Sequence, residues 1–212
     1  MYHVQDYENN KENRMEIKTR LIKEDDYIMT EWSGGKTTQI FIYPEGSNYK
    51  ELNFKFRLSS ATVELEKSEF TKLEGVNRFI TSLDNGLKLT HNHKKYINLK
   101  PFEVYEFDGG IDTTSYGMAR DFNLMLRDGV EGQLESIYID KECLIVEEVP
   151  SDFKEVFYFI YACDNEVYVD IKEDTKPISP FQTLLVRSNN NILNLKLRSE
   201  KPVNILIAKI YI

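Results

Sequence analysis

The chain has 212 residues, which is enough for one large all-β domain or for two small ones. Its formal net charge of -8 argues against a nucleic-acid-binding protein, because such proteins carry basic stripes. No apolar run of about 18 residues occurs, so the sequence predicts no membrane span. The 13 Tyr and 12 Phe favour strands over helices.

The cysteine count and the N-terminal segment indicate the cellular setting. Cys143 and Cys163 are too few for a disulfide framework, and we expect both to be buried thiols. Residues 1–14 are polar and lack the apolar core of a signal peptide, so we expect an N-terminal extension there. Together these features predict a cytoplasmic protein.

Apolar residues alternate along most of the chain, which is typical of strands. The first strand is expected over residues 15–22, followed by a charged turn at 23–27 and a strand over 39–43. The stretch 54–89 should form a long strand, a charged corner and a hairpin closed by Asp84-Asn85-Gly86, because Asn-Gly favours tight turns. Later strands are expected over 101–107, 121–126, 133–149, 155–162, 166–171, 183–187, 192–197 and 203–212.

Helix signals are confined to two short segments, 118–121 and 151–155, each long enough for a single turn. Many short strands at near-regular spacing with polar turns between them indicate a sandwich or a barrel. No sequence repeat relates the two halves, although their strand patterns are similar.

One strand carries an unusual polar face. Arg57, Ser59 and Ala61 share a face because side chains alternate along a strand, and one long cation with two small neighbours suggests a pocket floor. A structural interpretation pairs Arg57 with a fixed carboxylate such as Asp121 or Asp108. A functional interpretation gives Arg57 an anionic ligand, such as a carboxylate held by two hydrogen bonds.

The other motifs in the sequence give weaker evidence about function. Residues 34–37, Gly-Gly-Lys-Thr, lack the earlier glycine and the following helix of a phosphate loop, so we read them as a tight turn at a pocket rim.

His91 and His93 are followed by two lysines and lack further ligands, so we expect an exposed loop and no metal site. A nucleophilic triad would need a histidine outside these tracts, and because the remaining histidine is His3 in the N-terminal extension, we expect no such triad. Three carboxylates remain candidates for acid and base work: Asp108, Asp112 and Asp121.

Five ordered segments resemble the HutD/Ves family: residues 32–39, 54–61, 70–78, 107–109 and 121–125. The resemblance is clear over residues 15–127 and continues only as a strand pattern beyond them. The chain departs from the family pattern at three positions. Phe56 replaces a common Trp, and Asn77 and Gly110 stand where acidic residues are common, which leaves any role of those acids in doubt here.

The resemblance implies an all-β bicupin, in which two cupin-like barrels of the double-stranded β-helix type share one chain. We expect the first barrel over residues 15–130 and the second over 131–212, completed by N-terminal strands. It also implies no metal and no cofactor. Some relatives are thought to bind a histidine-utilisation intermediate such as formylglutamate in a regulatory role, and others are stress-associated. By position, the ligand-binding candidates are Trp32, Arg57, Ser59, Arg78, Asp121 and Asn123.

We therefore expect a non-catalytic protein that binds a small anionic metabolite near Arg57 in its first barrel, with no nucleic-acid or membrane partner. The first alternative is a metal-independent cupin isomerase or epimerase with Asp or Tyr as acid and base. No catalytic residue is assigned for it. The second alternative is a structural module that associates into a homodimer.

Overall fold

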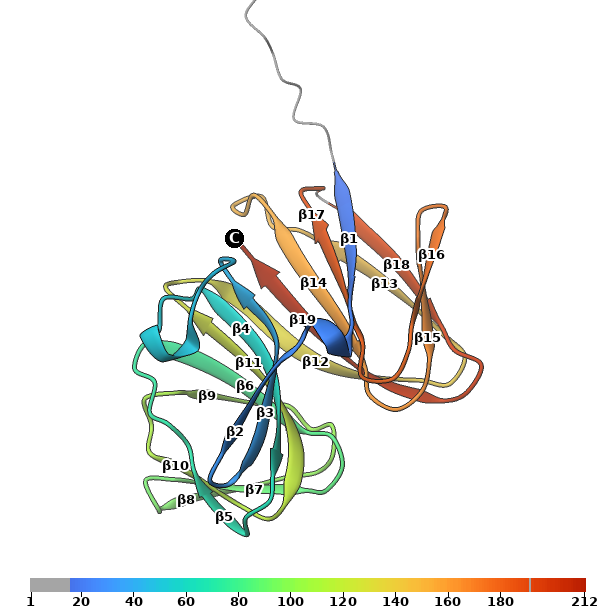
Figure 1. Cartoon of the computed structure of the whole chain (residues 1–212). Coiled ribbons are helices and arrows are strands. Elements are labelled where there is room, and N and C mark those ends of the chain that lie inside the picture. The colour runs from blue at the N-terminus through green and yellow to red at the C-terminus, as the bar shows by residue number, and fades with distance from the viewer. Residues whose placement is uncertain (1–15, 191) are drawn as a thin grey trace, which may run out of the picture.

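The computed structural model of the chain describes residues 16–190 and 192–212. Within them, short turns join the strands, and the helical segments are two 3-10 turns, η1 (Glu24–Asp26) and η2 (Tyr49–Glu51). The strands form two barrels side by side, each built from two facing sheets (Figure 1). The predicted all-β class with very little helix is confirmed.

The first barrel pairs a six-stranded sheet with a four-stranded one. In spatial order, the larger sheet contains β2 (Ile28–Trp32), β3 (Gly35–Tyr43), β4 (Phe56–Val63), β11 (Ala119–Arg127), β6 (Val76–Ser82) and β9 (Tyr105–Asp108). The smaller sheet contains β5 (Lys67–Glu69), β10 (Thr113–Tyr116), β7 (Leu87–His91) and β8 (Lys95–Leu99). All strand pairs in both sheets are antiparallel.

The second barrel pairs a five-stranded sheet with a four-stranded one. The larger sheet contains β1 (Ile17–Ile22), β17 (Thr183–Ser188), β14 (Val156–Ala162), β19 (Val203–Tyr211) and β12 (Glu131–Ile139). The smaller sheet contains β13 (Glu142–Glu148), β18 (Ile192–Arg198), β15 (Val167–Ile171) and β16 (Asp174–Ile178). Because β1 pairs with β17, the N-terminal strand lies in the barrel built mainly by the C-terminal half (Figure 1).

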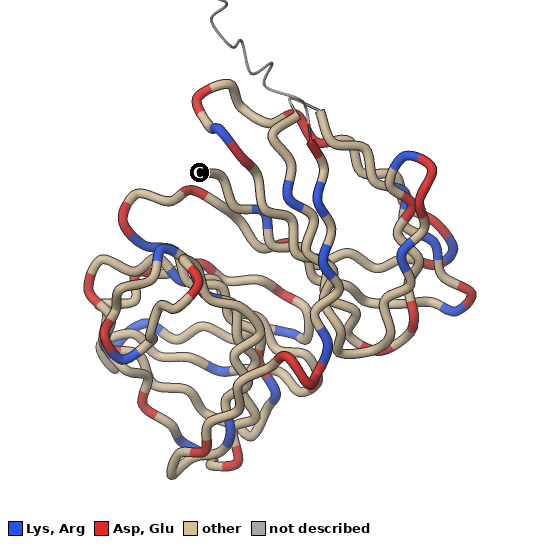
Figure 2. The backbone as a smooth tube through the Cα atoms, turned by 45° about the horizontal axis from the view of Figure 1, so that its top comes forward, with Lys and Arg blue, Asp and Glu red and all other residues tan. Residues whose placement is uncertain are grey.

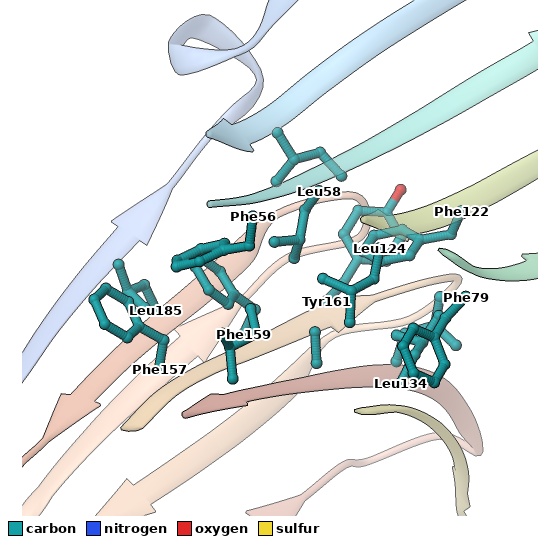
Figure 3. Close-up of a cluster of buried hydrophobic side chains, with 14 of the residues drawn as sticks. Phe56, Leu58, Phe79, Phe122, Leu124, Leu134, Phe157, Phe159, Tyr161 and Leu185 are labelled. Carbon is teal, nitrogen blue, oxygen red and sulfur yellow. The ribbon is translucent and has the colours of Figure 1, made fainter. Parts of the chain in front are cut away.

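An apolar core lies between the two larger sheets and joins the barrels (Figure 3). Alternation along β4 points Phe56 and Leu58 toward the second barrel, where Phe157 and Phe159 of β14 meet them. The rings of Phe56 and Phe157 are 5.2 Å apart in an edge-to-face arrangement. The outer face of the first barrel's large sheet is therefore a buried interface.

The interior of the second barrel is filled by apolar side chains. Tyr158 and Ile160 of β14 point inward and pack against branched residues such as Val167, Leu195 and Ile207. β14 is buried along its whole length, because one face lies in this interior and the other lies in the core between the barrels. Such a strand reads as a continuous apolar run.

The predicted hairpin at Asp84-Asn85-Gly86 is wrong. The chain bends at residues 83–85, but β6 before the bend pairs with β11 and β9, whereas β7 after it pairs with β10 and β8. The bend thus carries the chain from one sheet of the barrel to the other. Local turn chemistry predicts the reversal and leaves open which strands then pair.

Other expectations also need correction. Residues 119–121 begin strand β11 and form no helical turn, and residues 151–155 form no helix either. The predicted strand 133–149 is divided between β12 and β13, which lie in different sheets. Cys163 is a buried free thiol, but Cys143 is only half-buried. The expected extension at residues 1–14 lies outside the described residues.

Acidic and basic residues are interspersed over both barrels and gather mostly in turns and on outer strands (Figure 2). Among the described residues, no helix has the length and apolar character to cross a membrane. In contrast to these surface charges, a few charged groups are buried inside the first barrel. Because charged residues are rarely buried, these groups mark the candidate site.

Candidate functional site

The first barrel contains a cavity of about 880 Å³. Its walls come from β2, β3, β4, β6 and β11, with η2 and the segment after β5 at its mouth. All six ligand-binding candidates from the sequence line it, namely Trp32, Arg57, Ser59, Arg78, Asp121 and Asn123. The structure thus brings these residues together, while their role in binding a ligand stays a prediction.

Strand alternation explains why polar residues face this cavity. On β4, Phe56 and Leu58 face the second barrel, so Arg57, Ser59 and Ala61 face inward and line the cavity. The antiparallel register of β4 with β11 sets Ser59 opposite Asn123 and Ala61 opposite Asp121. The same β11 residues neighbour β6, where Met125 lies opposite Arg78.

Arg57 is buried and is held by neutral partners. Its Nε donates a hydrogen bond of 2.9 Å to Oε1 of Gln39, and its Nη1 donates one of 2.9 Å to Oγ of Ser59. The guanidinium also lies 4.4 Å from the centre of the Tyr49 ring. Burial lowers the pKa of Arg57, and Tyr49 and Asp121 oppose that shift.

The expected carboxylate partner of Arg57 is absent. Within the described residues, neither Asp121 nor Asp108 forms an ion pair with Arg57 at 4.0 Å or less. Asp108 is the last residue of β9, and its Oδ1 accepts a hydrogen bond of 2.8 Å from the Gly110 N–H in the turn that follows. The structural interpretation of Arg57 as one half of a fixed ion pair is therefore wrong.

Arg78 is as buried as Arg57 but less well satisfied. Its Nε is a buried donor without a hydrogen-bond partner. Its guanidinium lies between aromatic rings, 4.8 Å from the centre of Phe70 and 5.1 Å from that of Phe107. Burial lowers the pKa of Arg78 to about 10, so the group stays charged near neutral pH.

Asp121 is a buried carboxyl group on the cavity wall. Burial raises its pKa to about 7, while a hydrogen bond from the Ala61 N–H and the nearby charges of Arg78 and Arg57 lower it. The Ala61 N–H donates to Oδ1 at 3.2 Å. Next to it on the same face, Asn123 has a buried Oδ1 without a hydrogen-bond partner. The buried part of the cavity therefore holds two cations, one titratable acid and one unsatisfied amide.

Trp32 at the end of β2 also lies at the rim of the cavity. Trp32 is 41% exposed, and its indole folds over Gly34, where an added Cβ would lie 2.0 Å from the ring. A strand, β3, follows the turn, which agrees with the rejection of a phosphate loop. A side chain at position 34 would therefore displace the Trp32 indole from this place at the rim.

Sequence reasoning missed three residues that shape the site. Gln39 accepts the Arg57 hydrogen bond, and it follows Thr37 on the cavity face of β3, so strand alternation could have found it. Tyr49 and Phe70 stack near the guanidinium groups of Arg57 and Arg78. They come from a 3-10 turn and a loop, where no periodic pattern places a side chain.

The histidines need one correction. His91 lies buried in β7 and not in an exposed loop, with ring nitrogens 3.0 Å from the Thr113 hydroxyl and 3.1 Å from that of Tyr105. His93 is exposed in the turn that follows. No group of three or more potential metal-ligating His, Cys, Asp and Glu side chains occurs in the described part of the chain.

Comparisons with known proteins identify the family of this chain and solved structures that share its fold. The HutD family model matches residues 24–206, and a search of curated proteins finds no match. Solved structures with the same fold include PA5104, a conserved protein of unknown function from Pseudomonas aeruginosa PAO1, with 18% identity, a TM-score of 0.78 and coverage of 91% of this chain and 98% of that one.

Two further solved structures are similar to this chain to a lower degree. HutD from Pseudomonas fluorescens SBW25 has 21% identity and a TM-score of 0.68, with coverage of 90% of this chain and 98% of that one. A cupin 2 conserved barrel domain protein from Leptotrichia buccalis has 8% identity and a TM-score of 0.54, with coverage of 89% and 95%. The expected double-stranded β-helix class is thereby confirmed.

Proposed function

The chain belongs to the HutD family and has a cupin-type fold, and from this premise we propose that its first barrel binds a small anionic metabolite without transforming it. The proposal concerns the cavity around Arg57 and Arg78. The second barrel takes a structural part, because its interior is packed with apolar side chains.

The observation that carries this proposal is a pair of buried guanidinium groups that face a cavity with no ion-pair partner among the described residues. An uncompensated buried charge costs several kcal/mol. A carboxylate or similar anion inside the cavity would offset that cost, since it can accept two parallel hydrogen bonds from a guanidinium.

The shape and contents of the cavity fit a small molecule. Its volume of about 880 Å³ lies within the usual range for ligand pockets, roughly 300–1,000 Å³. Tyr49 and Phe70 supply flat apolar surface beside the cations, while Asn123 and Asp121 supply hydrogen-bonding groups that could select among anions. This mixture suits a metabolite that carries both a charged end and an apolar or polar body.

We assign the protein a regulatory or accessory role, linked to histidine utilisation or to a stress response. This assignment extends the family resemblance given under Sequence analysis, and the HutD structure from P. fluorescens was obtained in a formate condition. Formate is a carboxylate, and formylglutamate is the pathway intermediate that we put first among candidates. Regulation then follows from sensing the level of that anion.

The test is a thermal-shift screen of small carboxylates, including formate, glutarate and formylglutamate, with divalent metals in parallel. A ligand at about 100 times its dissociation constant should stabilise the folded protein by about 2.7 kcal/mol. We expect one carboxylate to raise the melting temperature of the wild type and to leave that of Arg57→Met unchanged.

The matched control is Arg20→Met, which removes the same charge from an exposed position on β1 and should respond as the wild type does. Loss of the shift in both variants would point to a general charge effect and would contradict the assignment. A carboxylate that stabilises Arg57→Met as much as the wild type would place the binding site elsewhere.

A second function, that of a metal-independent isomerase or epimerase, is favoured by one observation. Asp121 has a pKa raised to about 7 by burial and lines an open cavity, which suits a general base near neutral pH. Such an enzyme would exchange a carbon-bound proton of its ligand in D₂O, visible by proton NMR, and Asp121→Asn would stop the exchange. A ligand that binds and shows no exchange would exclude this reaction.

A further inference from the structure

The cavity of the first barrel also contains a proton-binding group whose charge bears on which anions it accepts. Resting on the proposed anion-binding function, we propose that Asp121 takes up a proton when a dianion binds beside Arg57 and Arg78. The cavity would then bind dianions tightly at low pH and release them as the pH rises, whereas monoanions would respond much less.

Charge balance in the buried part of the cavity is the first argument. Arg57 and Arg78 contribute two positive charges, and Asp121 contributes one negative charge only when it is ionised. An ionised Asp121 leaves one net positive charge, which one negative charge on a ligand balances. A protonated Asp121 leaves two, which a dianion balances. Binding of a dianion should therefore favour the protonated acid, because like charges held close together in a buried site repel.

The hydrogen bonds of Asp121 are the second argument. Its Oδ1 accepts from the Ala61 N–H, and no hydrogen bond from the described residues reaches Oδ2. Neither arginine comes within 4.0 Å of the carboxyl group, so no ion pair locks it in its ionised form. A proton on Oδ2 could be donated to a ligand oxygen, which turns a repulsive contact into a hydrogen bond.

The neighbours of Asp121 leave it free to titrate. Arg57 on β4 and Arg78 on β6 are the cations that act on it, and Asp84 after β6 is a further acid whose charge raises its pKa. Asp84 accepts hydrogen bonds from the N–H groups of Asn85 and Arg120, which hold it at the exposed turn. The side chain of Arg120 lies on the opposite face of β11, over the Phe181 ring.

Charged residues at the mouth of the cavity are exposed and have partners of their own. Glu31 lies 3.1 Å from the Lys36 ammonium, and Glu69 lies 3.6 Å from that of Lys67. Lys50 is also exposed. Solvent screens these rim charges, so they affect a buried ligand less than Asp121 does. The burial that raises the pKa of Asp121 to about 7 puts its titration within the physiological range.

The test is calorimetric titration with glutarate, a dianion, and butyrate, a monoanion of similar length. Both are almost fully ionised between about pH 6.5 and pH 8.5. If only the protonated acid with a pKa of about 7 accepts glutarate, its affinity for the wild type should fall about 25-fold over this interval. Butyrate should change less than about threefold. Repeating the titration in buffers of different ionisation enthalpy counts the protons taken up.

Asp121→Asn is the decisive variant, because an amide Oδ1 can still accept from the Ala61 N–H. It should bind glutarate across the whole interval with the affinity that the wild type shows at low pH. The control Glu31→Gln removes a rim carboxylate and should keep the pH dependence of the wild type. If Asp121→Asn does not fold, the proton count on the wild type decides alone.

Several outcomes overturn the proposal. Glutarate binding with no proton uptake, or an Asp121→Asn variant that keeps the pH dependence, contradicts the role of Asp121 and leaves anion binding intact. Wild-type protein that binds neither glutarate nor butyrate at any pH contradicts proton-linked binding of these anions. In that case the wider carboxylate screen decides whether the proposed anion-binding function also fails. Failure of proton-linked binding can therefore be distinguished from failure of anion binding.

Discussion

At the scale of single residues, the buried charges of the site lower the stability of the unliganded protein. Arg78 is buried, its Nε lacks a hydrogen-bond partner, and its guanidinium packs against aromatic rings without an ion pair to Asp121 or any other carboxylate among the described residues. Proteins keep such a group when function needs it, because an apolar residue of similar volume is often more stable in its place.

We predict that Arg78→Met raises the free energy of unfolding of the unliganded protein by about 1–3 kcal/mol, because methionine packs against Phe70 and Phe107 without burying a charge. Urea unfolding measures this change. The same variant should lose carboxylate binding. A loss of stability in the absence of ligand would mean that Arg78 is a structural residue.

The pH dependence of stability gives a second prediction at this scale. The pKa of Asp121 is raised to about 7 in the folded state from 3.8, so the folded state favours its protonated form. The associated stability is fully present below about pH 4 and is lost as the pH rises toward 7 and above. Relative to the wild type, Asp121→Asn should therefore gain stability as the pH rises, by up to roughly 4 kcal/mol at pH 8, because each pKa unit is worth about 1.4 kcal/mol.

Urea unfolding of both proteins at several pH values measures that difference. Glu31→Gln serves as the control for the loss of one negative charge, since Glu31 is exposed at the rim. A constant difference between Asp121→Asn and the wild type from pH 4 to pH 8 would show that Asp121 is ionised without penalty.

At the scale of elements, the β2–β3 turn holds one wall of the cavity in place. Gly35 has φ +145°, and an added Cβ would lie 1.9 Å from the Thr62 carbonyl oxygen of β4. We predict that Gly35→Ala displaces the turn, lowers the melting temperature and weakens ligand binding. Gly46→Ala is the control, because Gly46 also has positive φ but has open space around its Cβ position, so it should cost only about 1 kcal/mol.

Thermal unfolding and the carboxylate screen, run on both glycine variants, check this prediction. Equal effects of the two substitutions would mean that backbone conformation alone matters and that the close approach of β3 to β4 does not position the wall.

Much of this arrangement could be predicted from the sequence, and its failures have a common cause. Alternation correctly placed Arg57, Ser59 and Ala61 on one face of β4, because that rule depends only on neighbouring residues. The hairpin at residues 84–86 and the Arg57 ion pair with Asp121 were wrong. Both depend on which distant strands and side chains meet, and a single sequence does not contain that information directly. Arg78, Trp32 and Asn123 came from family resemblance, since no local pattern singles them out.

At the scale of the whole molecule, the two barrels share one core and should unfold together. Phe56 and Phe157 meet edge to face in the core between the larger sheets (Figure 3). The contrast between the barrels can be read in the sequence, because residues 156–162 are apolar on both faces whereas residues 57–61 are polar on one. The second barrel, whose interior is filled, thus stabilises the first barrel, which contains the cavity, through their shared core.

We predict that Phe157→Ala destabilises the protein by about 3–5 kcal/mol while leaving the ligand affinity of the folded protein unchanged, because Phe157 is fully buried between the barrels and away from the cavity. Calorimetry should show one transition in both proteins. Tyr96→Ala, at an exposed position on β8, is the control and should change stability little. Two separate transitions would show that the barrels fold independently.

The central claim is that an anion binds between the buried arginines of the first barrel. The most direct measurement is a crystal structure of the protein with bound glutarate at about pH 6.5. The account predicts a carboxylate group within hydrogen-bonding distance of the Arg57 or Arg78 guanidinium. A cavity that holds only water while glutarate is bound elsewhere on the protein would contradict it.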